Sequence, residues 1–258
     1  MTYTSSFSVA DLLLARRGGL RPLGQVFGAC AYQVGFAARP YTSGGTWPGY
    51  PKAGYVELGG PTRAWNHARE QALEQLRSEA VNLGADAVVG VSFKRRLRGG
   101  RLGIVEFVIN GTAVTTGSDP SGIPMLTMLS GSEVEALQQT GYTAKGIVAA
   151  STVTQVLPGY RTSYAYSGRR PFSNQELPDL SHTAVAARSN VLERLHKQRL
   201  GMDAEGLIGV TYEQHVEPDE GEGHRVTVTL HVVGTAISGR RPKTPSPQLA
   251  LALDQEST

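Results

Sequence analysis

Residues 62–91 read TRAWNHAREQALEQLRSEAVNLGADAVVGV, and the chain repeats this pattern 119 residues later as SHTAVAARSNVLERLHKQRLGMDAEGLIGV, residues 181–210. In both stretches apolar residues recur at helical spacing, and a glycine-containing apolar run typical of a buried strand follows. Such internal repetition is the first clue to architecture. We predict a long helix beginning after Thr62 and after Ser181, then a strand. The identical pairs include Ala68/Ala187, Arg69/Arg188, Leu73/Leu192, Leu76/Leu195, Gly90/Gly209 and Val91/Val210.

The repetition continues on both sides of these stretches. Upstream, an offset of 122 residues pairs Gly19 with Gly141, and downstream Gly111-Thr-Ala matches Gly234-Thr-Ala. The order is kept and only the connections differ in length, so we predict a duplicated domain of roughly 115 residues. The predicted domains are residues 1–117, a diverged second copy at residues 118–238, and a disordered C-terminal tail at residues 239–258.

Local patterns predict the same elements in both copies. Ser8 and Ser130 are each predicted to cap the N-terminus of a short helix that follows them. Apolar, β-rich runs at Leu23 to Val34 and Gly146 to Val156 predict one strand each, and the segment after each long helix predicts a hairpin. The expected fold class is α+β, with two similar domains. Each has a mainly antiparallel sheet packed on one long helix, plus a short N-terminal helix.

The composition is typical of a folded protein of the cell interior. Hydrophobic residues make up 40% of the chain, and the net charge of +3 is too small to require a polyanionic partner. Cys30 is the single cysteine, which excludes an intramolecular disulfide. We find no secretory signal and no apolar run of the roughly 18 residues that a spanning helix needs. We therefore expect a cytoplasmic location without a membrane contact.

Three segments carry a family resemblance: Ala68-Arg-Glu, then Leu83-Gly-Ala-Asp-Ala-Val-Val-Gly-Val, then Glu106 to Gly111-Thr-Ala-Val. Together they resemble the YbjQ-type heavy-metal-binding domain family, over roughly Leu20 to Val114. The second copy is a more diverged version. The resemblance implies a compact α+β domain, five-fold rings in single-domain relatives, and a metal-binding label without a catalytic residue set.

For a tandem chain, the resemblance implies a homo-oligomeric ring of about five chains. Five chains can form two stacked five-domain layers, or the unlike repeats can alternate around a single ring. Both arrangements remain open at this point.

The histidines provide one candidate metal site. None of the six lies in the Cys/His or His/carboxylate spacing of a closed zinc site. His215 and His224 flank the predicted turn of the second hairpin, where their imidazoles and nearby carboxylates could hold a transition metal ion. The alternative is a solvated hairpin end, because a register shift of one residue places the two rings on opposite faces. His67 and His196 lie outside the apolar stripes of their helices and are predicted at the surface.

Catalytic motifs are not recognisable in this sequence. No nucleophile elbow, phosphate loop or dinucleotide fingerprint occurs in the structural context that it requires. The glycine pairs Gly18-Gly19 and Gly44-Gly45 are typical of turns. We therefore do not expect an enzyme, and we assign no catalytic or cofactor-binding residue.

The two equivalent hairpins carry opposite charges. If hairpins of unlike repeats meet, within a chain or across an assembly, this contrast favours unlike over like contacts. One alternative is that both tips are solvated, because exposed pairs contribute only about 0–1 kcal/mol. A weaker alternative is polyanion binding by the basic hairpin, which lacks interleaved aromatics, so nucleic acid is not an expected partner. The candidate assembly contacts are Lys94, Arg95, Arg96, Arg98 and Arg101 on one hairpin, and Glu213, Glu217, Asp219, Glu220 and Glu222 on the other.

Two function classes follow from these observations. The first hypothesis is a non-enzymatic ring-forming assembly or scaffold protein that binds further copies of itself. Further protein partners are expected at the long aromatic loops, Gly35 to Gly60 and Leu157 to Leu180, or at the C-terminal tail. The second hypothesis is a metal- or small-ligand-binding module.

Overall fold

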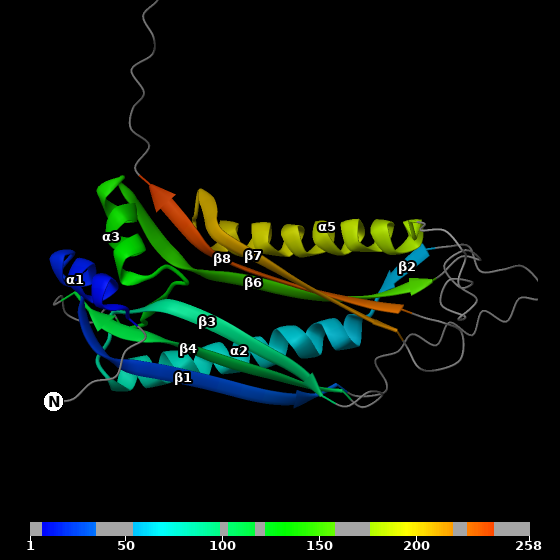
Figure 1. Ribbon diagram of the computed structural model, residues 1–258, viewed down its shortest axis with the longest axis horizontal. Coiled ribbons are helices and arrows are strands. Elements are labelled where there is room, and N and C mark those ends of the chain that lie inside the picture. The colour runs from blue at the N-terminus through cyan, green and yellow to red at the C-terminus, as the bar shows by residue number, and fades with distance from the viewer. Residues whose placement is uncertain are drawn as a thin grey trace, which may run out of the picture.

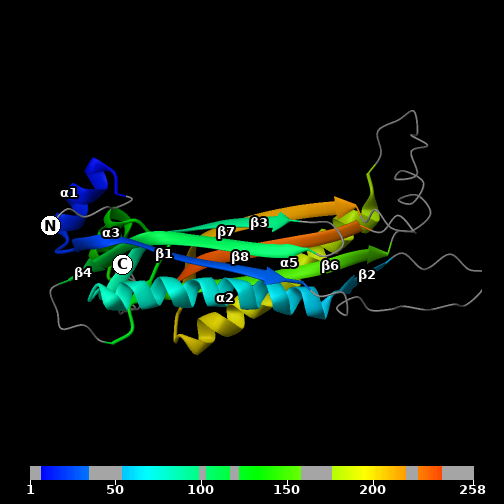
Figure 2. The same ribbon diagram turned by 90° about the horizontal axis from the view of Figure 1, so that it is seen from below.

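A computed structural model describes residues 7–34, 54–98, 103–116, 122–157, 176–218 and 226–239 (Figure 1). These residues form two four-stranded sheets, each covered by one helix of 24 residues, which confirms the α+β class. Figure 2 shows that the two long helices, α2 and α5, run along the same side of the molecule. The first half contains α1 (Val9–Arg17), β1 (Arg21–Gln33), β2 (Gly54–Glu57), α2 (Gly59–Asn82), β3 (Ala87–Arg98) and β4 (Ile104–Thr115). The second half contains β5 (Met125–Leu126), α3 (Gly131–Gln139), β6 (Tyr142–Leu157), α5 (Pro178–Gly201), β7 (Gly206–Pro218) and β8 (Val226–Gly239).

The two halves share their backbone irregularities as well as their element order. The register of β1 shifts between Pro22 and Gly24, and that of β6 shifts at the equivalent place, between Ala144 and Gly146. Positive φ angles also recur at equivalent positions. At such positions glycine avoids the steric cost that a side chain would bring. The halves therefore have matching local geometry, and the residue boundaries proposed for two domains remain a prediction. The matched positive-φ pairs are Gly19/Gly141, Gly84/Asp203 and Gly90/Gly209.

Each half contributes a short strand to the sheet of the other. The first sheet has the order β1-β4-β3-β5, so that β5 of the second half lies parallel to β3. The second sheet has the order β2-β6-β8-β7, so that β2 of the first half lies antiparallel to β6. At one end of the molecule α1 and α3 are also in contact, and the Ser132 hydroxyl donates to the Asp11 carboxylate at 2.7 Å. The two halves are thus joined by backbone pairing as well as by side chains.

The main hydrophobic core extends across the boundary between the halves. The Trp65 ring on α2 meets the Phe107 ring on β4 edge to face, with centroids 5.7 Å apart, and Val153 of β6 belongs to the same buried cluster. Burial of side chains of this size contributes about 1.5–3 kcal/mol each. A smaller core lies between α5 and the second sheet, around Val191, Leu195 and Leu230.

The starts of the long helices differ from the sequence prediction. Helix α2 begins at Gly59 and α5 at Pro178, and neither N-cap residue makes a side-chain capping bond. The Thr62 hydroxyl instead accepts the backbone N–H of Val153 on β6 at 3.0 Å. The predicted helix starts after Thr62 and after Ser181 were therefore wrong: both helices begin earlier, and the Thr62 hydroxyl makes a contact between the halves. The caps at Ser8 and Ser130 are confirmed.

Two predicted segment boundaries also differ from the structure. The expected loop from Gly35 to Gly60 contains β2 and the first turn of α2 in its described part. Gly239, assigned to the tail, is the last residue of β8. Residues 240–258 lie outside the described residues.

Candidate functional site

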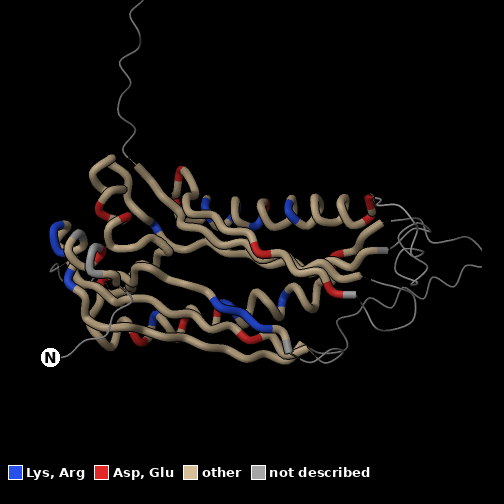
Figure 3. The backbone as a smooth tube through the Cα atoms, viewed as in Figure 1, with Lys and Arg blue, Asp and Glu red and all other residues tan. Residues whose placement is uncertain are grey.

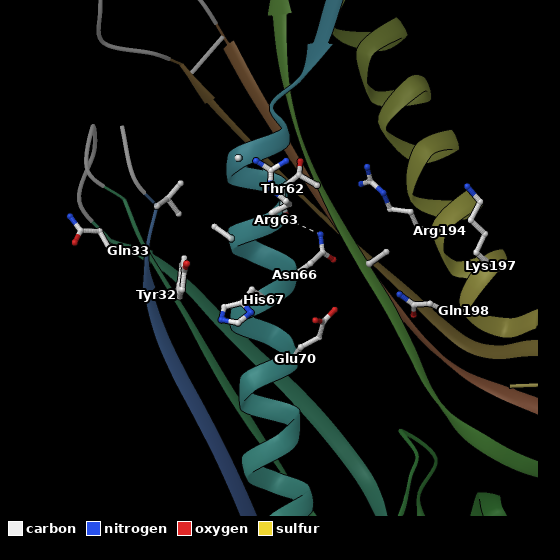
Figure 4. A pocket seen from close by; sticks show the side chains of 14 residues that line it. Tyr32, Gln33, Thr62, Arg63, Asn66, His67, Glu70, Arg194, Lys197 and Gln198 are labelled. Atoms are coloured by element: carbon white, nitrogen blue, oxygen red, sulfur yellow. Dashed lines mark hydrogen bonds between the residues drawn. The ribbon is translucent and has the colours of Figure 1, made fainter. Parts of the chain in front are cut away.

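A groove of about 1040 Å³ lies along α2, between the end of β1 and helix α5 (Figure 4). It borders the boundary between the two halves, so its walls come from elements far apart in the sequence. We call the contact surface between the halves the seam. The polar and aromatic side chains lining the groove are Tyr32, Gln33, Thr62, Arg63, Asn66, His67, Glu70, Arg194, Lys197 and Gln198.

The seam is closed along the edge of β6 by side chains of α2. The Asn66 Nδ2 donates to the Ser151 carbonyl and its Oδ1 accepts the Ser151 N–H, both at 3.0 Å. The next outward-facing amide, that of Val153, donates to Thr62, and the Val153 carbonyl accepts the Leu58 N–H at 2.8 Å. An edge strand normally exposes such groups to other chains. Here α2 supplies their partners, and β2 continues the pairing.

Helix α5 closes the same edge from the other side. The Gln198 amide bonds to both the N–H and the carbonyl of Ala149, each at 3.0 Å. Arg194 donates to the Ser151 carbonyl at 3.1 Å and to the Glu57 carboxylate at 2.5 Å. Because Glu57 comes from the exchanged strand β2, this ion pair also joins the two halves.

A buried polar cluster fills the centre of the seam. The Arg69 Nη1 donates to the Asn66 Oδ1 at 2.8 Å and to the Ser151 Oγ at 3.3 Å, and that hydroxyl lies 2.7 Å from the His231 Nδ1. Burial lowers the pKa of Arg69 to about 10. Burial, and then the nearby cations Arg69 and Arg95, lower the pKa of His231 to about 3. His231 is therefore neutral at physiological pH, while Arg69 stays charged.

The Ser151–His231 pair does not have the features of a nucleophile site. Both residues are buried, and no carboxylate orients the imidazole within the described contacts. The His231 Nε2 and the Arg69 Nε are buried without a hydrogen-bond partner among the described residues. A nucleophile must reach its substrate, and its base needs an orienting group. The cluster therefore acts as a structural contact between the halves.

The opposite charges of the two hairpins meet at one point of the seam. The Arg95 Nε lies 3.0 Å from the Glu213 Oε2, and its guanidinium carbon lies 5.4 Å from the centroid of the Trp65 ring. The basic run of β3 is visible as a continuous blue stretch in Figure 3. This contact lies within one chain, and the proposed contacts between copies remain a prediction.

The other predicted contact residues are distributed unevenly. Lys94 and Arg96 are exposed on β3, and Arg98 is its last residue. The remaining predicted residues, Arg101, Asp219, Glu220 and Glu222, lie outside the described residues.

The predicted metal site is only partly visible. The His215 Nε2 lies 2.9 Å from the Glu217 Oε1, on the exposed end of β7. His224 lies outside the described residues. His67 and His196 are at the surface, as predicted, and the His67 ring packs against Tyr32.

The described part of the chain does not otherwise provide a metal centre. Within it, no three side chains of His, Cys, Asp or Glu converge on one point. Cys30 is half-buried, and burial raises the pKa of its thiol, which disfavours the thiolate that binds metals. The described residues thus do not form a complete set of metal ligands.

Sequence reasoning did not identify the polar residues at the centre of the seam. Asn66, Arg69, Ser151 and His231 belong to regular elements, and none lies in a recognisable motif. The one available signal was Arg69, a charged residue within the apolar stripe of α2 between Ala68 and Ala72. A charge at such a position usually has a buried polar partner.

Comparison with known proteins agrees with the resemblance noted in the sequence. Residues 56–117 match the YbjQ family model, described as "Putative heavy-metal-binding". A UPF0145 protein of Actinobacillus pleuropneumoniae serotype 5b is 44% identical over 61 residues, which are 22% of this chain and 58% of that protein. The expected family resemblance is thereby confirmed for this segment.

A second relative aligns over almost the whole chain. The encapsulin nanocompartment protein of Mycobacterium tuberculosis is 27% identical over 263 aligned residues, covering 98% of this chain and 92% of that protein. Within the described residues, helices long and apolar enough to cross a bilayer do not occur.

Proposed function

We propose that this protein is a non-enzymatic, self-assembling scaffold, a building block of a larger protein assembly in the cytoplasm. The observation that carries the proposal is the exchange of β2 and β5 between the halves, because exchanged edge strands are a means of joining repeated units. The relative that aligns over most of the chain is named a nanocompartment protein, which supports the same class. The role that we infer is mechanical, and it needs no cofactor.

The proposed assembly is a ring in which the two halves of successive chains alternate. Alternation favours unlike contacts, of which Arg95 and Glu213 already make one inside the chain. The family resemblance implies five-fold rings, so we propose five chains. In an alternating ring, five chains contribute ten halves. We also place Lys94 and Arg96 among the residues that contact a further copy.

Native mass spectrometry of the untagged protein at low and moderate salt tests this function. We expect a discrete species of several chains, about five, that persists at micromolar concentration. A single-chain mass across the concentration range would overturn the proposal. A stacked pair of five-domain layers has the same mass as an alternating ring of five chains, and electron microscopy separates them, because only the stacked form has two layers.

A metal-binding module is the second candidate function. The contact between His215 and Glu217, together with the description of the matched family, favours it. The test is a titration of the metal-stripped protein with zinc, copper and nickel, repeated on His215→Ala/His224→Ala. The matched control is His182→Ala, which alters an exposed histidine of α5. Selective loss of binding in the double variant supports the site, and equal binding by all three proteins excludes it.

A further inference from the structure

Both sides of the seam have counterparts elsewhere in the chain, and those counterparts are exposed. On one side of the seam, α2 and β3 of the first half cover β6 and β8 of the second. By position in the repeated fold, α5 and β7 correspond to α2 and β3, while β1 and β4 correspond to β6 and β8. We propose that α5 and β7 of one copy bind β1 and β4 of a second copy, head to tail, in the way that the seam joins the two halves. This inference rests on the proposed self-assembly.

The helix side of this interface is exposed on α5. In the seam Thr62 and Arg69 of α2 are buried, the latter with only 2% of its surface accessible. At the equivalent positions of α5, Ser181 and Arg188 are exposed. Val185, the counterpart of Asn66, is 70% exposed. The same helix face is thus covered in the first half and open in the second.

Strand β7 has a matching open surface. Phe93 and Leu97 of β3 pack against the main core. Their counterparts on β7, Tyr212 and Val216, are 47% and 41% exposed. The Arg188 guanidinium carbon lies 5.9 Å from the centroid of the Tyr212 ring, so α5 and β7 present one continuous surface. Isolated exposed apolar residues are common, but a joined set marks a contact site.

The strand side is exposed on β1 and β4. Every residue of β6 from Val148 to Val156 is buried, whereas Phe27 and Ala31 of β1 are exposed, Phe27 by 48%. Every residue of β8 from Val228 to Ala236 is buried. In β4, burial alternates with half-exposure from Val105 to Asn110, as at Val108. Burial on both faces indicates a sheet that is covered on both sides, and alternation indicates one open face.

The outer edge of β1 resembles that of β6, and part of it is available to a further strand. The N–H groups of Phe27 and Ala29 donate to Glu79 and Gln75 of α2, much as Ala149 is bound by Gln198. Within the described residues, β1 is an edge strand, and no strand pairs with it on that side. In the second sheet the corresponding side of β6 holds β2. An incoming copy can therefore add backbone pairing at Ala31 to Gln33.

Residues that face each other in the seam are polar on both sides, whereas their counterparts on the exposed surfaces are apolar on both sides. This matched difference identifies a second copy as the molecule that binds the exposed surfaces. In the seam, Asn66 of α2 faces Ser151, which lies opposite His231 in the β6–β8 register. The counterparts are Val185 for Asn66, Ala29 for Ser151 and Val108 for His231, and Ala29 lies opposite Val108 in the β1–β4 register. Polar groups meet polar groups inside the chain, and apolar groups would meet apolar groups between copies.

This paired change also specifies which surfaces combine. If α2 bound the open face of β1 and β4, the polar Asn66 rather than the apolar Val185 would lie against Ala29 and Val108. Buried polar groups without partners cost about 1–3 kcal/mol each, and more when they are charged. Mismatched combinations are thereby disfavoured, as specific assembly requires. The contact is heterologous, so repeated copies close into a ring or extend as a filament.

A cysteine cross-link between copies tests the proposal. In a Cys30→Ser background, the pair Val185→Cys and Ala29→Cys is oxidised, and products are separated without reductant. The single variants are negative controls, and the pair Asn66→Cys and Ser151→Cys is the positive control for a link within one chain. We expect a ladder of covalent multimers from the first pair only. Asn66 and Ser151 are neighbours in the seam, because they hydrogen-bond directly, so the positive control shows whether cysteines at this pair of positions reach disulfide geometry.

A charged substitution separates this inference from the proposed function. Val185→Glu places a carboxylate at an exposed helix position, where folding is expected to be unaffected, and circular dichroism checks this. We expect at least a tenfold rise in the concentration needed for assembly. If the wild type assembles but Val185→Glu assembles equally well and no cross-linked multimers form, this interface is wrong and the scaffold function stands. A wild type that is always a single chain overturns both.

Discussion

Asn66 of α2 binds both the N–H and the carbonyl of Ser151 on β6, each at 3.0 Å, although 85 residues separate them. A side-chain amide with this geometry replaces a neighbouring strand at one position of a sheet edge. It also accepts a hydrogen bond from Arg69 and so connects the edge to the buried cluster. The join between the halves therefore depends on a few specific polar contacts as well as on apolar area.

Replacement of Asn66 by alanine is predicted to weaken the seam. Asn66→Ala leaves the Ser151 backbone groups and the Arg69 guanidinium short of partners, and each unsatisfied group costs about 1–3 kcal/mol. We expect a loss of about 2–3 kcal/mol in the free energy of unfolding, measured by urea denaturation at fixed protein concentration. Arg63→Ala, an exposed change on the same helix, is the control. Equal stability of the two variants would contradict the role of Asn66.

His231 predicts a specific dependence of stability on pH. Its pKa is lowered to about 3 in the folded protein, chiefly by burial, against about 6.5 when unfolded. Below pH 6.5 the unfolded state binds a proton that the folded state does not. The free energy of unfolding therefore decreases as the pH is lowered, by up to about 1.4 kcal/mol per pH unit. Above pH 6.5 the effect is absent. Denaturation curves from pH 7.5 to 4.5 measure this slope.

The matching control is His231→Gln, which keeps a polar side chain but cannot titrate. We expect a shallower fall of stability with acidity in this variant, even if its stability at pH 7.5 is lower. The difference between the two slopes isolates His231 from the other histidines. Parallel curves for the variant and the wild type would show that His231 is not the responsible group.

The elements with a long periodic pattern were predictable from sequence. The apolar stripe through Ala68, Ala72 and Leu76 indicated α2, and alternation indicated the paired strands on either side of it. The capping serines Ser8 and Ser130 also identified α1 and α3. In each case the signal lies within a few residues, so it does not depend on how the halves are placed.

The exchanged strands and the seam were not predictable in this way. Strands β2 and β5 have four and two residues, too few to show alternation. The roles of Thr62 and Asn66 depend on the relative placement of the halves, which local spacing does not encode. His231 looks like any residue of an alternating strand, and it is buried because both faces of β8 are covered.

Arg95 predicts an energetic effect from charge reversal. Arg95→Glu removes the contacts with Glu213 and Trp65 and places two carboxylates together. Only 8% of the Arg95 side chain is accessible, but Glu213 is exposed to screening solvent, so we expect a loss of about 1–3 kcal/mol rather than the larger cost of a fully buried pair. Urea denaturation measures the effect, with Lys145→Glu, an exposed reversal on β6, as control.

The reciprocal variant Arg95→Glu/Glu213→Arg separates the two contributions. It restores opposite charges but leaves Trp65 without a cation above its ring, an interaction that contributes about 0.5–1 kcal/mol at accessible sites. We therefore expect partial recovery of stability relative to Arg95→Glu. No recovery would show that the ion pair itself contributes nothing.

Gly28 predicts a steric limit on how α2 packs against β1. A Cβ added at Gly28 would overlap the Ala72 carbonyl oxygen and would lie 2.8 Å from the Leu76 amide nitrogen, so the helix backbone has to move. Such overpacking costs about 1–3 kcal/mol, and Gly28→Ala should lower the unfolding free energy by at least this amount. Gly24→Ala is the control, because its Cβ meets only a Leu83 methyl group at 3.4 Å. The counterpart of Gly28 in the second half is Ala150, which shows that α5 leaves room for a methyl group there. If Gly28→Ala proves as stable as Gly24→Ala, α2 does not approach β1 as closely as described.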